Sequence, residues 1–325
     1  MGAMRRVVTG SRNPRQVRGR PATGGRLVRR VTRGVTLLAV LAMTALVVPE
    51  SQQASTEASL VKVRTGNAVD VSPDVIWIAA VGSDARPWED MTRTRGDALQ
   101  MVGINTRTGS AVAFGIPRDS WVRLPNGRTD RINSALSSGG PQLMARAMGD
   151  LFGIQPDYVL VTRFEGLEEM VGAIGRITVD NPYAFSDVNL RPEGFEAGRI
   201  ELGKYGALNY ARIRKGLKDG DFGRSANQQR VMRGIHATIV EKRKRPGFIE
   251  KGALAVLKHT HTDASPTQVF KIAQAVAQVD ARRITTCVLP GTIGNAGAAS
   301  VVFPDTATAR RWGRATEKDA SLSRC

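Results

Sequence analysis

The chain has 325 residues, of which 42% are apolar and 23% are charged. This balance supplies enough apolar side chains for a core and excludes a chain that is disordered throughout. Two cysteines are too few for a disulfide-built scaffold or a cysteine-rich zinc module. Three histidines argue against a metal centre built on histidine. The formal net charge of +18 is concentrated in residues 1–33, which contain ten arginines and no acid, and the rest of the chain carries +8. A moderately basic body suits an anionic ligand and does not require nucleic acid.

The basic tail is followed by Gly34–Val48, fifteen residues without a charge. A basic segment before an apolar run is typical of a signal sequence or a membrane anchor. As a helix the run spans about 22 Å, against ~30 Å for the hydrocarbon core of a bilayer, a gap that snorkelling by Arg33 helps to close. Pro49-Glu50-Ser51 follows in place of a small-x-small cleavage site. We therefore favour an uncleaved signal anchor over a cleaved signal or a buried core helix.

An anchor with ten arginines before it places the N-terminus in the cytoplasm and the body outside. The sequence thus predicts a single-pass protein of the cell membrane with an extracellular body. The arginine-rich tail then lies against the membrane, where anionic lipid is the simpler partner, and we predict no nucleic-acid partner.

Residues 49–72 are polar and aperiodic, which predicts a linker, and the folded part begins near Pro73. Short apolar strands and amphipathic helices then alternate up to residue 303. The predicted strands are Val75–Val81, a hairpin of Leu99–Ile104 and Ala111–Ile116, Tyr158–Thr162, Ile177–Val179 and Ile284–Leu289. The predicted helices are Gln142–Leu151, Leu167–Ile174, Gly206–Ile213, Ser225–Lys242, Phe248–Lys258 and Pro266–Val279. This order predicts a single α/β domain with a central mixed β-sheet flanked by helices.

Residues 304–325 are polar, and we expect a loosely held tail there. The chain ends on Cys325, and an extracellular location allows a disulfide between this residue and Cys287. The sequence leaves open whether the two pair.

Two carboxylates follow or precede neighbouring predicted strands. Asp84 lies directly after the first strand, and Asp97 lies directly before the first strand of the hairpin, beside Arg95. Paired carboxylates with arginines nearby are what a Mg²⁺–phosphate site needs, because Mg²⁺ takes one or two carboxylates and completes its shell with phosphate oxygens and water. The alternative is two solvent-facing turn aspartates in ordinary ion pairs.

Two further clusters supply positive charge. Arg118-Asp119 follows the second hairpin strand at the same predicted sheet edge, and Arg131 comes shortly after. The denser cluster contains Arg212, Arg214, Arg224 and Gln228. Arg212 and Arg214 share a face if the segment is extended, and Arg224 and Gln228 align if the helix has begun. Guanidinium groups suit a pyrophosphate because each donates two parallel hydrogen bonds. The alternative is a basic helix face in solvent.

Six motifs, in this order, resemble the LytR-CpsA-Psr family of cell-wall glycopolymer transferases. They are GSDAR, RGD before an apolar strand, IPRDSWV, INSALSSGGP, YARIR and GDFGRxxNQQ, and they extend from about Val75 to Met232. The resemblance implies an extracellular α/β domain with an apolar tunnel for a polyprenyl chain, lined by helices such as Leu143–Leu151, Leu167–Ile174 and Val231–Val240.

The implied reaction moves a glycopolymer from a polyprenyl pyrophosphate carrier onto a peptidoglycan hydroxyl through a phosphodiester bond. By the same resemblance Asp84 and Asp97 hold Mg²⁺, or Mn²⁺ in its place, and act in catalysis together with Arg118. The residues implied in binding the pyrophosphate are Arg95, Arg118, Arg131, Arg212, Arg214, Arg224 and Gln228. Asp119 is expected to orient Arg118 rather than to contact the substrate.

Two other functions fit the same residues. One is a non-catalytic, membrane-anchored binder of polyprenyl phosphate or wall polymer, and the other is a pyrophosphatase that acts on the lipid carriers. The paired carboxylates favour an enzyme, since a binder gains little from two acids placed close together. Arginine outnumbers lysine 37 to 10, which hints at a GC-rich genome. The polymer is then arabinogalactan or a chain of the wall-teichoic-acid kind, and the sequence does not choose between them.

Overall fold

A computed structural model describes residues 57–64, 66 and 74–325 of the chain. The predicted basic tail, the predicted anchor at residues 34–48 and most of the predicted linker lie outside these residues. Among the described residues, no helix is both long and apolar enough to cross a bilayer.

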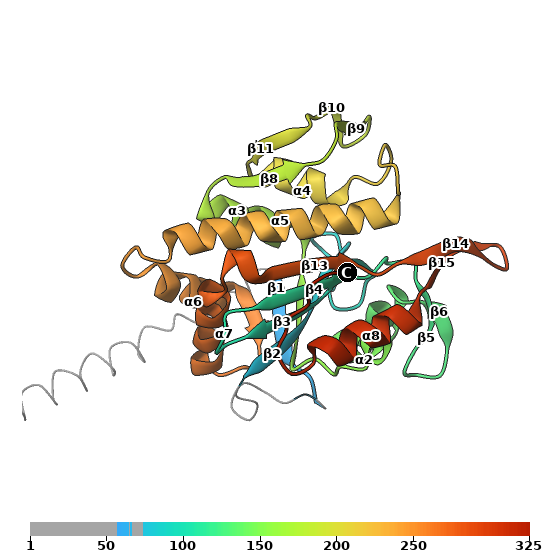
Figure 1. Cartoon of the computed structure of the whole chain (residues 1–325), viewed down its shortest axis with the longest axis horizontal. Helices are drawn as coiled ribbons and strands as arrows, with labels where there is room; N and C mark the ends of the chain where they lie inside the picture. The colour runs from blue at the N-terminus through green and yellow to red at the C-terminus, as the bar shows by residue number, and fades with distance from the viewer. Residues whose placement is uncertain (1–56, 65, 67–73) are drawn as a thin grey trace, which may run out of the picture. The chain divides into compact units, whose positions relative to one another are not determined.

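The described chain forms a mixed α/β structure around one seven-stranded sheet (Figure 1). Along the sheet the strands follow the order β12 (Thr260–Thr262), β1 (Ala58–Lys62), β7 (Tyr158–Thr162), β2 (Val75–Ser83), β3 (Gly96–Asn105), β4 (Ala111–Gly115) and β13 (Ile284–Val288). The pairs β12–β1, β7–β2 and β4–β13 are parallel, and the other three pairs are antiparallel. The predicted mixed sheet and its hairpin are therefore confirmed.

Alternating side chains of the sheet supply two separate cores. Trp77 and Met101 point to the face covered by α2 (Ser134–Phe152) and α8 (Thr306–Thr316). Ile76 and Ile104 point to the opposite face, which is covered by α7 (Pro266–Gln278) and reached by α6 (Phe248–His259). This alternation follows from the period of two in a β-strand.

A third core lies in a lobe beside the sheet, at the top of Figure 1. The lobe contains α3 (Phe164–Ile174), β8 (Ile177–Asn181), β9 (Phe185–Asp187), β10 (Arg191–Phe195), β11 (Gly198–Leu202) and α4 (Lys204–Arg212). The long helix α5 (Asp221–Lys242) joins the lobe to the sheet, because it packs on β8 and also contacts β3, β4 and β13. The short pair β5 (Trp121–Arg123) and β6 (Thr129–Arg131), the 3₁₀ turn Ala281–Arg283 and the hairpin of β14 (Gly291–Ala296) and β15 (Ala299–Pro304) complete the described elements.

The folded part extends beyond both ends that we expected from the sequence. Residues 58–62, inside the expected linker, form β1 between β12 and β7, with Leu60 buried in the core. Residues 306–316, inside the expected loose tail, form α8. Its Trp312 is buried and stacks on Phe114 with 5.4 Å between ring centroids. Apolar burial at both positions explains why these polar-looking segments are held in place.

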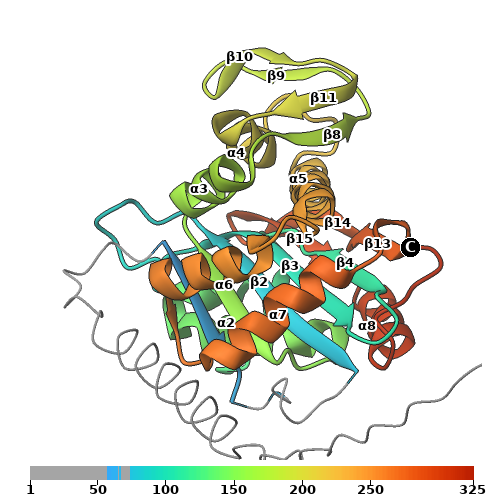
Figure 2. The ribbon, with the colours of Figure 1, turned by 90° about the vertical axis from the view of Figure 1, so that its left-hand side faces the viewer.

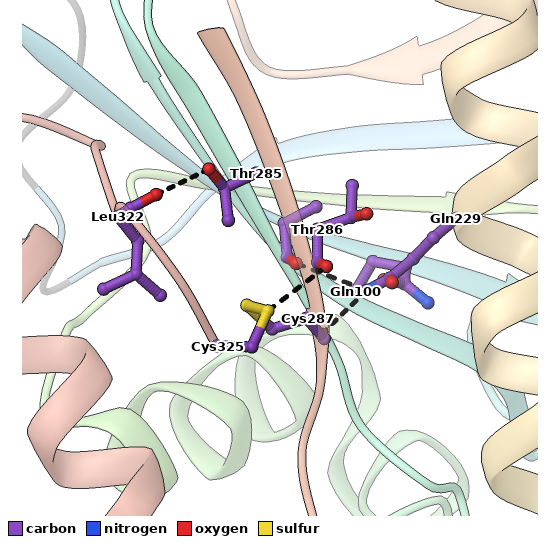
Figure 3. Close-up of a disulfide and its surroundings, with 8 residues drawn as sticks. Gln100, Gln229, Thr285, Thr286, Cys287, Leu322 and Cys325 are labelled. Atoms are coloured by element: carbon purple, nitrogen blue, oxygen red, sulfur yellow. Dashed lines mark hydrogen bonds between the residues drawn. A yellow bond between two sulfur atoms is a disulfide. The ribbon is translucent and has the colours of Figure 1, made fainter.

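A disulfide between Cys287 and Cys325 fixes the end of the chain to β13 (Figure 3). The two Cα atoms are 5.6 Å apart. Thr285 adds a hydrogen bond from its hydroxyl to the carbonyl of Leu322, at 2.6 Å. The pairing that the sequence left open is therefore present, and the C-terminal segment is tied to the sheet by covalent and polar contacts.

Of the three helical segments expected to line one tunnel, residues 167–174 and 231–240 share the core of the lobe, whereas residues 143–151 lie on the other face of the sheet. Leu143–Leu151 belongs to α2, whose Met144 and Met148 are fully buried against one face of the sheet. Residues 231–240 belong to α5, which contacts the opposite face through Gln100. Because Gln100 lies between Leu99 and Met101, which face α2, the sheet separates the two helices.

Candidate functional site

The two predicted carboxylates meet at the end of the β2–β3 ladder. The strands pair from Val75↔Asn105 to Gly82↔Ala98, and the register then shifts to Ser83↔Gly96, so that Asp97 is the extra residue of a bulge. The Asp84 amide donates to the Arg95 carbonyl at 3.2 Å, and the Arg95 amide donates to Asp84 Oδ1 at 3.1 Å. A bulge at a strand end redirects a side chain, and here it brings Asp97 to the same edge as Asp84.

Burial raises the pKa of the Asp84 carboxyl above its ordinary value, and the negative charge of Asp97 raises it further. Hydrogen bonding from the Arg95 amide and the charge of Arg118 act in the opposite direction but do not cancel the effect. The two carboxylates are therefore close enough to repel each other, and a cation between them would relieve that repulsion.

Arg118 approaches the carboxylate pair from the end of β4. Its guanidinium forms an ion pair with Asp97 through Nη1, and both side chains are largely buried. The Arg118 Nε atom is buried and has no hydrogen-bond partner among the described residues. The prediction that Arg118 and the carboxylates share one sheet edge is confirmed by this contact.

Asp119 lies at the centre of three arginines. Its carboxylate is 3.6 Å from Arg131 Nε, 3.7 Å from Arg214 Nη1 and 3.9 Å from Arg118 Nε. The Asp119 side chain is only 15% exposed, which suits a group that orients its neighbours. Arg131 also donates to the carbonyl of Ser300 at 2.8 Å, so it connects this cluster to the β14–β15 hairpin.

The first turns of α5 carry a buried ion pair next to these groups. Arg224 bonds to Asp221 one turn earlier, and the exposed fractions of the two side chains are 7% and 5%. Burial lowers the pKa of Arg224 and raises the pKa of Asp221, although each charge partly stabilises the other. The charges of Arg118 and Asp97 also act on Arg224, so the helix start belongs to the same electrostatic cluster.

Gln228 lies one turn after Arg224, as the spacing predicts, because α5 has already begun at Asp221. Its side-chain amide donates to the carbonyls of Ala211, at 3.4 Å, and Asp97, at 3.5 Å. Its side-chain oxygen accepts from Gln100 at 3.4 Å. Gln228 thus links α5 to the bulge that carries Asp97.

A polar network that sequence reasoning missed supports this end of α5. Gln229 donates to the carbonyl of Cys287 at 2.8 Å, and to Gln100 Oε1 and the carbonyl of Ala113 at 3.2 Å each (Figure 3). Gln100 is a polar residue inside an otherwise apolar strand, and that interruption was the available signal. Asp221 was also missed as the partner of Arg224, although the two lie in one motif.

Arg95 and Arg212 make contacts of a different kind from the ion pairs around Asp119. Arg95 is exposed and lines a hollow of about 630 Å³, together with Asp84, Arg86, Glu89, Thr94 and Ser137. Arg212 stacks over the ring of Phe164 at 4.3 Å. The condition for a face shared by Arg212 and Arg214 is not met, because Arg212 is the last residue of α4 and the chain becomes extended only at Ile213.

The comparison with known families settles the class of protein. A sequence profile described as "LytR_cpsA_psr family" matches residues 43–317, which is most of the chain. This chain belongs to the LytR_cpsA_psr family. The resemblance noted in the six motifs is thereby confirmed.

Two curated relatives and one solved structure illustrate the likeness within the LytR_cpsA_psr family. The chain is 32% identical over 171 residues to the polyisoprenyl-teichoic acid–peptidoglycan teichoic acid transferase TagU of Bacillus licheniformis, a match that covers 52% of this chain and 54% of the relative. It is 32% identical over 202 residues to TagU of Halalkalibacterium halodurans, covering 60% and 64%. The chain therefore spans less than two thirds of the length of these relatives.

The fold of this LytR_cpsA_psr chain is similar to the crystal structure of B. subtilis TagV. The TM-score is 0.63, the sequence identity is 22%, and the match covers 77% of this chain and 99% of TagV. At this identity the likeness supports the fold, a mixed sheet flanked by helices.

Proposed function

We propose that this chain is a transferase that moves a glycopolymer from a polyprenyl pyrophosphate carrier onto a hydroxyl of peptidoglycan. The observation that carries the proposal is the convergence of Asp84, Asp97, Arg118, Arg214 and Arg224 at one edge of the sheet. The name of the TagU relatives, polyisoprenyl-teichoic acid–peptidoglycan teichoic acid transferase, supports the same type of reaction.

The charges suit a pyrophosphate group. The substrate carries negative charge on both phosphates, and guanidinium groups offer paired donors that keep their charge at any physiological pH. Arg118 has a buried Nε that makes no described hydrogen bond and lies 3.9 Å from Asp119, and Arg214 is about half exposed beside Asp119. We propose that these two donate to the pyrophosphate, that Arg95 contacts it from the neighbouring hollow, and that Arg224 adds buried positive charge behind them.

The remaining predicted residues have different roles in this proposal. Asp119 holds Arg118, Arg131 and Arg214 in place, as expected of an orienting residue. Gln228 keeps the start of α5 against the bulge of Asp97. Arg212 stacks on the ring of Phe164 through the face of its guanidinium, which leaves its in-plane N–H groups for the pyrophosphate.

The carboxylate pair fits a divalent cation. Among the described residues, no group of three or more His, Cys, Asp or Glu side chains could hold a metal ion, and we propose Asp84 and Asp97 as its two protein ligands. Two carboxylates suffice for Mg²⁺, or Mn²⁺ in its place, when substrate phosphate oxygens and water complete the shell. Such an ion, when bound, supplies positive charge for the developing negative charge on the leaving phosphate.

The reaction balances without a further reactant. The peptidoglycan hydroxyl oxygen bonds to the phosphorus that carries the glycopolymer, and the bond from that phosphorus to the bridging oxygen breaks. Polyprenyl phosphate leaves with the bond electrons, and the hydroxyl proton passes to water. Positioning and charge neutralisation dominate this chemistry, and the arginine cluster supplies both.

The polyprenyl chain needs an apolar surface near the arginines. We propose that it lies on the sheet face shared by α5 and α7, where Val102 and Leu160 are only partly buried. Leu167 of α3 and Ile239 of α5 are likewise partly buried apolar residues on the lobe side. This placement keeps α3 and α5 from the predicted lining and leaves out α2, which lies on the other face of the sheet.

A transfer assay tests the proposal. The full chain is incubated with polyprenyl pyrophosphate-linked polymer and peptidoglycan, with and without Mg²⁺, and the products are analysed by mass spectrometry. We expect phosphodiester-linked polymer from the wild type and from Arg245→Ala. We expect about 10²–10³-fold less from Arg118→Lys and Asp97→Asn, the range for loss of one electrostatic stabiliser. Free polymer phosphate in place of linked polymer would indicate a pyrophosphatase, and binding without any product would indicate a binder.

A further inference from the structure

The loop between β2 and β3 holds a tryptophan ring in solvent. Trp77 and Trp312 are buried in the core, whereas Trp88 is 76% exposed. The guanidinium of Arg86 lies over the Trp88 ring, with its central carbon 5.7 Å from the ring centroid. A large apolar side chain in solvent is informative when it is held in place, because it then offers a preformed contact surface.

The turn that carries Trp88 is fixed by hydrogen bonds and by its sequence. The Glu89 amide donates to the Arg86 carbonyl at 2.9 Å, and the Arg86 amide donates to Glu89 Oε2 at 2.7 Å. Pro87 restricts the backbone at the second position of this turn. The side chain of Arg163, only 8% exposed, donates to the carbonyls of Arg86 and Glu89. The Trp88 ring is therefore preorganised, which lowers the entropic cost of binding a ligand.

Trp88 stands beside the hollow of about 630 Å³ at the end of the β2–β3 ladder. Arg86 and Glu89, the two ends of its turn, line this hollow together with Asp84, Thr94, Arg95 and Ser137. Two carboxylates balance the two guanidinium groups, so the hollow lacks the excess of arginines found around Asp119. The hydroxyls of Thr94 and Ser137 both donate and accept hydrogen bonds. An uncharged ligand rich in hydroxyls suits such a lining, and the volume is typical of small-molecule sites.

The hollow adjoins the proposed phosphate site on the side away from the proposed lipid surface. Asp84 and Arg95 belong to both. In phosphoryl transfer the attacking and the leaving oxygens lie roughly in line, so the acceptor hydroxyl enters opposite the departing polyprenyl phosphate. We placed the polyprenyl chain on the sheet face of α5 and α7, whereas Ser137 belongs to α2, which covers the opposite face (Figure 2). The hollow therefore lies on the side from which the acceptor arrives.

We propose that the hollow and the Trp88 ring form the acceptor subsite and bind the sugar chain of peptidoglycan. The C–H face of one sugar ring lies against the indole, and its hydroxyls bond to Arg86, Glu89 and Ser137. The bound chain then brings its reacting hydroxyl to Asp84. This inference rests on the proposed transfer reaction for the identity of the acceptor, although the binding itself needs no donor. A sugar of the donor polymer has the same stacking chemistry, and the kinetic experiment below distinguishes the two.

Binding of peptide-free peptidoglycan oligosaccharides to the full chain, without donor, tests the subsite by isothermal titration calorimetry. Trp88→Ala removes a ring that already lies in solvent, so the fold is kept. We expect at least about tenfold weaker binding, as for an aromatic residue at the centre of a contact, and partial recovery in Trp88→Phe.

Tyr205→Ala is the matched control for this binding experiment. Tyr205 lies on α4, is 62% exposed, and has Lys204 Nζ 4.7 Å from its ring centroid, much as Trp88 has Arg86. The Tyr205→Ala variant should bind like the wild type. Three results overturn the proposal: a wild type that does not bind the oligosaccharides, full affinity in Trp88→Ala, and an equal loss in Tyr205→Ala.

Transfer kinetics distinguish the acceptor sugar from the donor sugar. Trp88→Ala should raise the half-saturating concentration of peptidoglycan about tenfold and leave that of the polyprenyl pyrophosphate-linked polymer unchanged. A rise for the donor alone assigns the ring to the glycopolymer and overturns the acceptor subsite. A chain that binds the oligosaccharides through Trp88 but transfers nothing keeps the sugar subsite and contradicts the proposed transfer, so the two failures are distinguishable.

Discussion

The charged side chains at the two ends of α5 differ in burial. At the N-terminal end, Asp221 and Arg224 are buried as a pair, and Gln228 and Gln229 are buried in a polar network. Directly after the C-terminal end, Lys244 and Arg245 are exposed, and α6 follows with one buried residue. Buried pairs hold groups at fixed positions, which suits chemistry, whereas exposed charges are screened by water and salt. Helix α5 therefore connects the fixed charges of the candidate site to an exposed basic segment.

The largest predicted change in the free energy of unfolding comes from breaking the buried ion pair of Asp221 and Arg224. Arg224→Ala leaves the carboxylate of Asp221 buried without its partner, which costs about 3–5 kcal/mol of the free energy of unfolding. Arg245→Ala, in the turn after the other end of the helix, should change it by less than ~0.5 kcal/mol. Urea unfolding of both variants measures the contrast. A similar loss in both would show that the two ends do not differ as described.

A second prediction concerns the disulfide that supports the N-terminal end of α5. Replacing Cys287 and Cys325 by serine opens a bridge between residues 38 apart in sequence, and we expect a loss of about 2–4 kcal/mol. Hydrogen exchange should increase in β13 and in the segment after α8, which the disulfide and the bond from Thr285 to Leu322 hold to β13, and should stay unchanged in α6. Faster exchange in α6 alone would contradict this account.

A third prediction concerns substrate binding. Arg118→Ala removes the partner of Asp97 and one donor for the pyrophosphate, so the affinity for polyprenyl pyrophosphate should fall by at least ~30-fold, which corresponds to ~2 kcal/mol. Isothermal titration calorimetry measures this affinity. Arg245→Ala serves as control, and an equal change in both variants would argue against a specific site.

The smallest predicted effect is a pH dependence of stability that comes from His236, in the C-terminal half of α5. Burial lowers the pKa of His236 below 6.5, and the positive charges of Arg243 and Arg233 act in the same direction. The unfolded chain then binds this proton more readily than the folded one, so stability falls as pH is lowered through 6.5 toward the folded pKa. Thermal unfolding between pH 5 and 7.5 should show a shallower decline for His236→Gln. An unchanged decline would remove His236 as its source.

Much of the fold could be predicted from periodicity, and the errors have physical causes. The buried residues of α8 keep helical spacing but are mostly small or polar, so the apolar pattern is weak. They are Thr308, Ala309, Trp312, Gly313 and Thr316. Strand β1 has five residues and places Ser59 as well as Leu60 in buried positions, so its composition resembles a linker. Short elements of this kind depend on their neighbours rather than on their own pattern.

In the candidate site, too, some contacts could be predicted from the sequence and others could not. Asp84, Asp97 and Arg118 could be brought together from the sequence because antiparallel neighbours place their ends at one edge. The partners of Arg212 and Arg131 could not, because they depend on where α4 ends and on a hairpin about 170 residues away in sequence. The sequence therefore predicted the charged groups of the site but not which of them form ion pairs and hydrogen bonds with one another.

The most direct test of the proposed function is the lipid that the protein carries. The full chain is purified in detergent from bacterial membranes, and its organic extract is analysed by mass spectrometry. We predict polyprenyl phosphate or pyrophosphate bound to the wild type and to Arg245→Ala, and its loss from the Arg118→Ala/Arg214→Ala variant. A wild type without lipid that also fails to take up added polyprenyl pyrophosphate, or a variant that retains the lipid equally, would contradict the account.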